Sequence, residues 1–179
     1  IVEEKLYDHD YISHQTENWQ AEKEHLSAFT PEKMEDICGI PANELRAAAR
    51  TFARGKAGMI FWGMGISQHV HGTDNSRCLI SLALMTGNVG KPGAGLHPLR
   101  GQNNVQGASD AGLIPMFLPD YQSVTDQKIR HSFTEVWQSD DFSNEKGLTV
   151  TEIMDAIHGD SILGMYILGE NPAMSDPDV

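Results

Sequence analysis

Two short apolar runs, each followed by a glycine-rich turn, constrain the fold of this chain most. The first run is Met59–Trp62, which leads directly into Gly63-Met64-Gly65, and the second is Ile162–Leu168, which leads into Gly169–Pro172. Short apolar runs bounded by turn residues are typical of buried strands in a parallel sheet. We therefore predict two parallel strands whose carboxyl ends open into turns.

Helical patterns precede and separate these runs. Residues 1–57 are polar and charged, and we predict a helical part there, including a helix over Tyr11–Phe29. Thr30-Pro31-Glu32 begins a helix that Gly39 ends, because Thr caps, Pro suits the first turn and Glu meets the positive end of the dipole. A further helix follows Pro41, has one apolar face and ends at Gly55.

Residues 58–179 are predicted as the α/β part of the same domain. Thr73 caps a helix that Gly87 ends, and Thr149 with Glu152 forms a capping box for another. Residues 88–148 lack clear periodicity apart from one short helix over Asp126–Trp137, so we predict an excursion loop. The expected fold class is α/β: a partial, Rossmann-like parallel-sheet domain with helices packed on the sheet and a long amide-rich loop. Because no helix follows the second strand, we expect an incomplete domain and a fragment.

Composition excludes several classes of protein. The 179 residues include 25 Asp and Glu against 13 Lys and Arg, a formal charge of −12, so we expect no nucleic-acid partner. No apolar run approaches the about 20 residues of a spanning helix, so we expect no direct membrane span. Cys38 and Cys78 are too few for an iron–sulfur cluster or a Cys₄ zinc site, and free thiols are favoured over a disulfide, which stays open. His69 and His71 have no third ligand nearby, and we assign no metal site.

The segment Arg100–Gly107 carries the densest chemistry. Four carboxamides lie within five residues, namely Gln102, Asn103, Asn104 and Gln106. Carboxamides present a donor and an acceptor together, which suits the edge of a pterin or a base, and the arginine offers a bidentate fork to a carboxylate or phosphate. The alternative is a polar surface loop with Asx turns. The glycine turns also have two interpretations: they let the backbone approach a phosphate, or they serve the shape of the backbone alone. Both stay open, because Gln68 stands where a complete dinucleotide-binding fingerprint has glycine.

Four segments resemble a known family. These are Phe61–Gln68, Leu84–Gly93, Leu99–Gly107 and Ile167–Asp176. They are similar to catalytic subunits of molybdenum- or tungsten-dependent formate dehydrogenases, in the dimethyl sulfoxide reductase superfamily. The resemblance covers essentially the whole chain, and Arg-Gly-Gln-Asn-Asn-Val-Gln-Gly is its most specific element.

This resemblance implies a function. Family members oxidise formate to carbon dioxide with a bis(molybdopterin guanine dinucleotide) cofactor that carries Mo or W and lies between two α/β domains. Arg100 matches the family arginine that holds formate, and is the candidate catalytic residue. The resemblance also implies cofactor-binding roles for Gly63, Met64, Gly65, Gln68, Gly101, Gln102, Gly169, Glu170 and Asn171.

The rest of the machinery is expected elsewhere in the parent protein. The family's metal-ligating Cys or selenocysteine and the cysteines for a [4Fe–4S] cluster belong to a part upstream, so we expect this chain alone to be inactive. The implied partners are formate, the remaining domains of the same subunit and electron-transfer subunits, and we expect a cytoplasmic location. The alternatives are another molybdopterin oxidoreductase, such as a nitrate reductase, and a non-catalytic α/β binding module.

Overall fold

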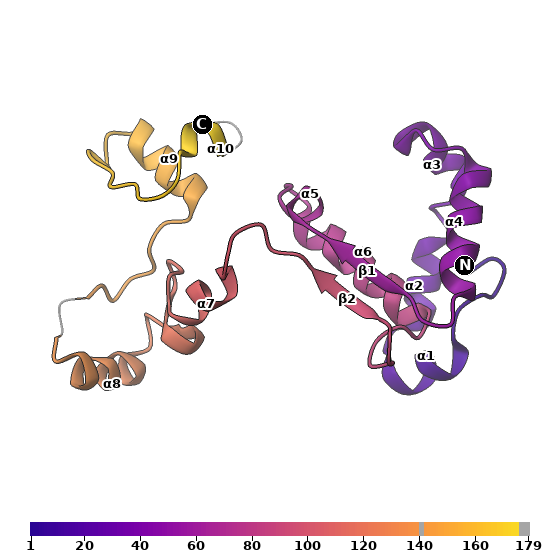
Figure 1. Ribbon diagram of the computed structural model, residues 1–179, viewed down its shortest axis with the longest axis horizontal. Coiled ribbons are helices and arrows are strands. Elements are labelled where there is room, and N and C mark those ends of the chain that lie inside the picture. Colours follow the sequence, from indigo (N-terminus) through magenta and orange to yellow (C-terminus); the bar gives the residue numbers. More distant parts are fainter. Residues whose placement is uncertain (140–141, 176–179) are drawn as a thin grey trace. The chain divides into compact units, whose positions relative to one another are not determined.

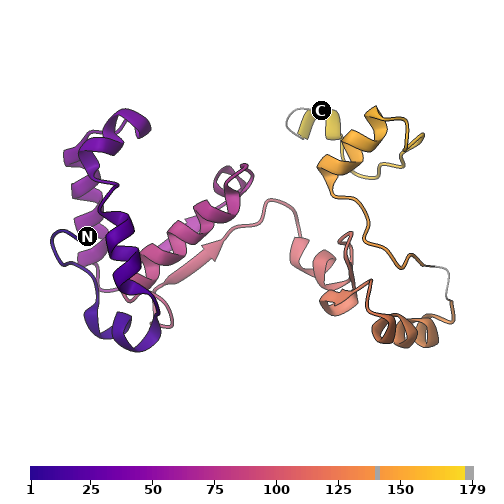
Figure 2. The same cartoon turned by 180° about the vertical axis from the view of Figure 1, so that it is seen from behind.

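The computed structural model describes residues 1–139 and 142–175. The chain forms two compact units, residues 1–101 and the part that follows from Gln102, and each is described by itself (Figures 1 and 2). The division into a helical part and an α/β part at residue 58 stays a prediction.

The first unit begins with helices α1 (His9–Gln15), α2 (Trp19–Leu26), α3 (Pro31–Cys38) and α4 (Ala42–Arg54). The predicted limits of α3 are confirmed: the Thr30 side chain accepts a hydrogen bond from the Lys33 amide, and Gly39 ends the helix at φ 69°. The single helix predicted over Tyr11–Phe29 is wrong. Asn18 adopts a left-handed conformation at φ 60°, and this turn separates α1 from α2.

A parallel strand pair forms the sheet of the first unit. Strand β1 (Met59–Trp62), predicted from its apolar run, pairs with β2 (Gly95–Pro98) from Met59 opposite Gly95 to Trp62 opposite Pro98. The connection contains the one-turn helix α5 (Met64–Ser67) and the long helix α6 (Gly72–Met85), which packs against β2 (Figure 1). Strand β2 lies inside the segment predicted as an excursion loop, and the sequence pattern did not indicate it.

Buried Asn88 joins the start of β1 to the end of α6. Its side chain is 2% exposed, its Oδ1 accepts from the Gly58 amide at 2.9 Å, and its Nδ2 donates to the Thr86 hydroxyl at 2.9 Å. At the other end of α6 the predicted Thr73 cap is wrong. The helix begins at Gly72, where a Cβ would stand 1.8 Å from the Ser67 carbonyl oxygen, so the close approach of α5 sets the start.

The second unit contains short elements on longer connections. They are α7 (Val105–Asp110), β3 (Phe117–Leu118), η1 (Pro119–Tyr121), β4 (Gln122–Ser123), α8 (Gln127–Trp137), α9 (Val150–His158) and α10 (Pro172–Ser175). Strands β3 and β4 form a small antiparallel hairpin. Two predicted helix starts are confirmed: Asp126 caps α8, and a capping box of Thr149 and Glu152 begins α9.

The second predicted parallel strand, Ile162–Leu168, is wrong. The segment has no strand structure, and Leu163, Tyr166 and Leu168 are 90%, 87% and 82% exposed. A strand needs a neighbour for its backbone N–H and C=O groups. Within the described residues, β1 and β2 pair with each other and no strand pairs with this segment. The mixed α/β class with a small parallel sheet is nevertheless as predicted.

Candidate functional site

The carboxyl ends of β1 and β2 bring two predicted site segments to one edge of the sheet. Gly63-Met64-Gly65 follows β1, and Leu99-Arg100-Gly101 follows β2. The Leu99 amide donates to the Trp62 carbonyl at 2.7 Å, which extends the parallel pairing to the start of both turns. Because the strands are parallel, the two turns open on the same side, where open α/β sheets bind ligands.

Glycine permits the contact between these two turns. A Cβ on Gly101 would stand 2.5 Å from Cε and 3.2 Å from Sδ of Met64, so the Met64 side chain lies over Gly101. A Cβ on Gly63 would stand 3.7 Å from the Leu99 carbonyl oxygen. The corresponding position on Gly65 is open, since no atom of the described residues lies within 4 Å apart from its chain neighbours and the backbone of its own helix.

Helix α5 orients the turn that follows β1. The Ile66 amide donates to the Gly63 carbonyl at 3.1 Å, and the Gln68 amide donates to the Met64 carbonyl at 2.7 Å. Gln68 thus ends the helix, and its side chain is exposed. Six predicted site residues therefore lie on this edge and its one-turn helix: Gly63, Met64, Gly65, Gln68, Arg100 and Gly101.

The Arg100 side chain is exposed at this edge. Two other arginines of the unit are already bound to carboxylates, Arg46 to Glu32 and Arg50 to Glu4. In the described part of the chain no hydrogen bond or ion pair engages the Arg100 guanidinium, so its fork is free to bind a carboxylate from outside.

The amide-rich segment continues into the second unit, which begins at Gln102. Asn104 caps α7, with its Oδ1 accepting from the Gly107 amide at 3.2 Å. Gln106 donates to Asp110 at 3.2 Å and to the Tyr121 hydroxyl at 3.3 Å. Two of the four carboxamides therefore serve the local fold: Asn104 through a nearby backbone amide, as in the Asx-turn alternative, and Gln106 through two side chains. The side chains of Gln102 and Asn103 are exposed.

The remaining predicted residues, Gly169, Glu170 and Asn171, form one turn of the second unit. Gly169 has φ 74°, and Glu170 accepts from the Ser175 hydroxyl at 3.2 Å. The Asn171 carbonyl accepts from the Met174 amide at 2.9 Å and so begins α10. These three residues lie together, but the turn follows an irregular segment and not the predicted strand.

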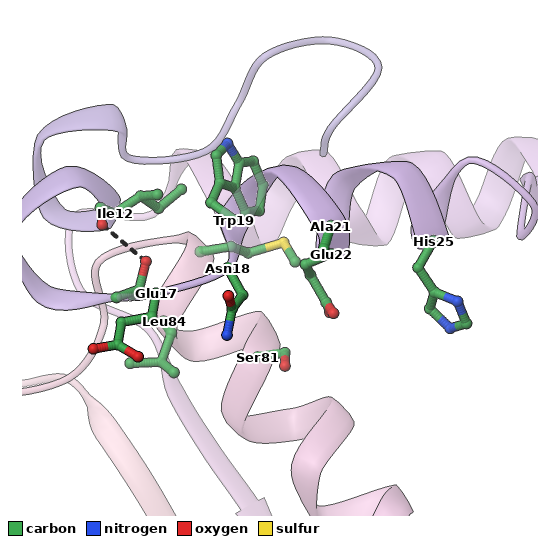
Figure 3. Close-up of a pocket in the computed structure, with 11 residues that line it drawn as sticks. Ile12, Glu17, Asn18, Trp19, Ala21, Glu22, His25, Ser81 and Leu84 are labelled. Carbon is green, nitrogen blue, oxygen red and sulfur yellow. Dashed lines mark hydrogen bonds between the residues drawn. The ribbon is translucent and has the colours of Figure 1, made fainter.

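Two cavities in the first unit were not predicted. One, of about 360 Å³, lies between α1, α2 and α6 and is lined by Ile12, Trp19, His25 and Ser81 among others (Figure 3). The other, of about 560 Å³, is bounded by α2, α3, α4 and the first residues of the chain. Neither contains a predicted site residue. Each is formed by helices packing side by side, and no local sequence pattern indicates such a space.

Two carboxylate–guanidinium pairs line the larger cavity. Arg50 binds Glu4 through its Nε and Nη2 atoms, and Arg46 binds Glu32. The hydrogen bonds from these guanidinium groups lower the pKa of Glu4 and of Glu32 and raise the pKa of both arginines. Both pairs are open to solvent and tie the first residues and α3 to α4.

The described residues contain neither a cluster of three metal-ligating side chains nor a membrane-spanning helix. No three His, Cys, Asp or Glu side chains in that part of the chain lie close enough to share a metal ion. Cys38 and Cys78 are both exposed free thiols. No helix within residues 1–139 and 142–175 is long and apolar enough to cross a membrane.

Comparison with known proteins identifies the family. The model of the molybdopterin oxidoreductases matches residues 10–179. The chain belongs to the molybdopterin oxidoreductase family. It is 42% identical to formate dehydrogenase H of Escherichia coli K12 over 180 residues, which cover 100% of this chain and 25% of that protein. The predicted resemblance to formate dehydrogenases is thereby confirmed.

Two further relatives in this molybdopterin oxidoreductase family have different names. The alpha subunit of the F420-dependent formate dehydrogenase of Methanocaldococcus jannaschii is 42% identical over 100% of this chain and 26% of its own length. A nitrate reductase of Synechocystis is 33% identical over 97% of this chain and 25% of its own length. The chain thus spans about a quarter of the length of these relatives.

Proposed function

We propose that this chain is part of the catalytic subunit of a formate dehydrogenase, which oxidises formate to carbon dioxide at a molybdenum or tungsten centre. The observation that carries the proposal is the Arg100 guanidinium, which has no hydrogen bond or ion pair among the described residues and lies at the carboxyl edge of β1 and β2, beside the Gly63–Gly65 turn. The names of two 42% identical relatives support formate as the substrate. In this proposal Arg100 binds formate.

The residues of this edge fit a bulky anionic cofactor. The open position at Gly65 would be filled by a Cβ, so glycine leaves room for a ligand against the backbone. We propose that bis(molybdopterin guanine dinucleotide) is held by Gly63, Met64, Gly65, Gln68 and Gly101, and further by Gln102, Gly169, Glu170 and Asn171. When bound, the cofactor supplies the metal centre that accepts two electrons. The [4Fe–4S] cluster and the metal-ligating residue belong to the parent polypeptide outside this chain.

Arg100 has a positioning task as well as a charge. Its planar fork can donate two parallel hydrogen bonds to the two oxygens of formate, which fixes the direction of the C–H bond. An ammonium group provides the charge without this geometry. The fork therefore contributes orientation that lysine cannot replace.

The test is Arg100→Lys in the full-length subunit loaded with cofactor. Losing one charged, bidentate contact is expected to lower kcat/KM for formate by roughly 10- to 100-fold, measured by reduction of a viologen dye. Metal and pterin content should stay at the wild-type level. Arg77→Lys is the matched control, because Arg77 is exposed on α6 and pairs with Asp74 at 3.4 Å. Formate kinetics that are unchanged in Arg100→Lys would refute the role.

A nitrate reductase-like activity is the second candidate, supported by the Synechocystis relative. Formate with oxidised viologen and nitrate with reduced viologen, each offered to the loaded subunit, distinguish the two, since only the true substrate should change the oxidation state of the dye. The third candidate, a non-catalytic module, predicts neither pterin nor metal in the purified parent protein.

We further propose that the parent subunit works in the cytoplasm with electron-transfer subunits. Two exposed free thiols, Cys38 and Cys78, are consistent with a reducing compartment. The chain by itself is expected to show no formate oxidation, because the metal ligand and the remaining domains are supplied by the parent polypeptide.

A further inference from the structure

Two side chains hold the carbonyl groups of the one-turn helix α5. The His69 ring Nε2 lies 2.7 Å from the Gly65 carbonyl oxygen, and the Asn75 Nδ2 donates to the Ile66 carbonyl at 3.0 Å. The last carbonyls of a helix have no partner inside it, and a single turn is not stable by itself. Side-chain donors from outside α5 therefore contribute to the position of this turn.

Close packing at the beginning of α6 fixes the backbone that carries these two donors. Gly72 is buried against the Ser67 carbonyl, in space that no side chain could share, and its amide donates to the His69 carbonyl at 2.9 Å. At its far end α6 is fixed by Ala83, which is fully buried, and by Asn88. Asn75 lies in the first turns of this helix and reaches back to α5 across nine positions of the sequence.

The position of α5 sets the position of the proposed site. Met64 is the first residue of α5, and its side chain lies over Gly101, next to Arg100. A shift of α5 would therefore move the Gly63–Gly65 backbone. It would also break the contact between the Met64 side chain and Gly101, the residue that follows Arg100.

We propose that Asn75 and His69 are positioning residues for the cofactor- and formate-binding edge. Their donors hold the carbonyls of Ile66 and Gly65, and thereby keep the glycine turn and Met64 in place beside Arg100. Neither residue is assigned contact with formate or with the reacting atoms. This inference rests on the proposed function.

Asn75→Asp removes a donor and keeps the shape of the side chain, whereas His69→Glu removes a donor and has His69→Gln as its shape-matched partner. Asn75→Asp replaces the donating NH₂ by an oxygen, and His69→Glu places an oxygen near the position of Nε2. His69→Gln places an amide nitrogen there and restores a donor. Asn43→Asp is the charge-matched control for Asn75→Asp, because Asn43 is exposed in the first turn of α4.

Three quantities are measured on the full-length subunit: the rate at which pterin is released, the KM for formate of the loaded fraction, and the Tm of the cofactor-free protein. Loss of one hydrogen bond to a carbonyl is expected to raise the release rate about tenfold and the KM about fivefold in Asn75→Asp and His69→Glu. We expect kcat of the loaded fraction and the Tm to stay close to wild type. His69→Gln and Asn43→Asp should match wild type in all three.

The outcomes separate this inference from the proposed function. Equal release rates and equal KM in all variants, with pterin present in the wild type, overturn the positioning role alone. A Tm that falls together with pterin content, and equally in His69→Gln, shows a merely structural role and also overturns it. Absence of pterin from the wild-type subunit overturns both proposals.

Discussion

Two apolar runs of this chain look alike in sequence and differ in structure. Met59–Trp62 becomes β1, since Gly95–Pro98 lies parallel to it and pairs with its backbone. Ile162–Leu168 remains irregular, with Leu163 90% exposed. An apolar run followed by glycine therefore marks a segment suited to be a strand. Whether it becomes one depends on a neighbour that supplies hydrogen bonds.

The turns that follow the two runs differ in the same way. The Gly63–Gly65 turn is held by contacts with Leu99, Gly101 and the His69 ring, and the Asn75 side chain of α6 bonds the next residue, Ile66. The turn at Gly169–Asn171 is held by hydrogen bonds to Met174 and Ser175, a few residues further along the chain. Precise placement of backbone groups toward a ligand requires the first kind of support. The edge of β1 and β2 is accordingly the better-defined part of the candidate site.

The sharpest test of this difference is proline substitution in each run. Ile60→Pro should destabilise the first unit by about 1–3 kcal/mol, because proline removes a donor from the β1–β2 pairing and leaves an acceptor without its partner. Leu163→Pro should change the stability of the second unit by less than about 0.5 kcal/mol, since an exposed, irregular segment loses no pairing. Urea unfolding, with amide hydrogen exchange as the probe, measures the free energy of unfolding of each unit separately. If Leu163→Pro were as costly as Ile60→Pro, residues 162–168 would be part of a strand.

A second prediction concerns the buried anchor of β1. Asn88→Leu should cost about 2 kcal/mol, because it leaves the Gly58 amide without its acceptor and removes the donor to the Thr86 hydroxyl, which keeps its own bond to the Leu82 carbonyl. The loss should appear in the first unit and leave hydrogen exchange in α9 unchanged. Asn43→Leu serves as the exposed control, and an equal loss in both variants would contradict the anchoring role.

The smallest expected effect concerns two glutamates whose pKa values are lowered for different reasons. The Arg50 hydrogen bond lowers the pKa of Glu4 across 46 positions, whereas the Thr149 backbone lowers the pKa of Glu152 within one helix start. A lowered pKa stabilises the folded state above the unfolded pKa, and this contribution disappears as the pH falls through the folded pKa. Acidification should therefore weaken both contacts.

The variant Arg50→Gln separates these two causes. It should return the pKa of Glu4 toward its usual value and leave the pKa of Glu152 where it is, because the capping box needs no partner from elsewhere in the chain. Carboxyl carbon NMR titration measures both groups. A matching rise at Glu152 would show that its low pKa also depends on the first unit.

Local signals predicted much of the secondary structure. Thr30 and Gly39 delimit α3, Asp126 caps α8, and Thr149 with Glu152 begins α9, all as their residue types indicate. Strand β2 was missed because Gly95-Leu-His-Pro98 has no apolar run and ends in proline. Its pairing with β1 provides what its own sequence lacks.

The candidate site shows the same division. The sequence indicated the glycine turn, Arg100 and the amide-rich segment, and their roles stay predictions. The sequence did not indicate that Met64 lies over Gly101, that Arg100 lacks a carboxylate partner among the described residues, or that Asn104 and Gln106 serve the fold around α7.

The sequence by itself determined both limits of α3, the starts of α8 and α9, and the family to which the chain belongs. Caps, glycines and motif residues act within a few positions of one another, so their effect can be predicted without the rest of the molecule. Only the tertiary structure decided which apolar run became a strand and how the two turns meet at Met64 and Gly101. A strand pairing and a contact between two turns each need two segments that lie far apart in the sequence. The pattern of one segment alone therefore does not predict them.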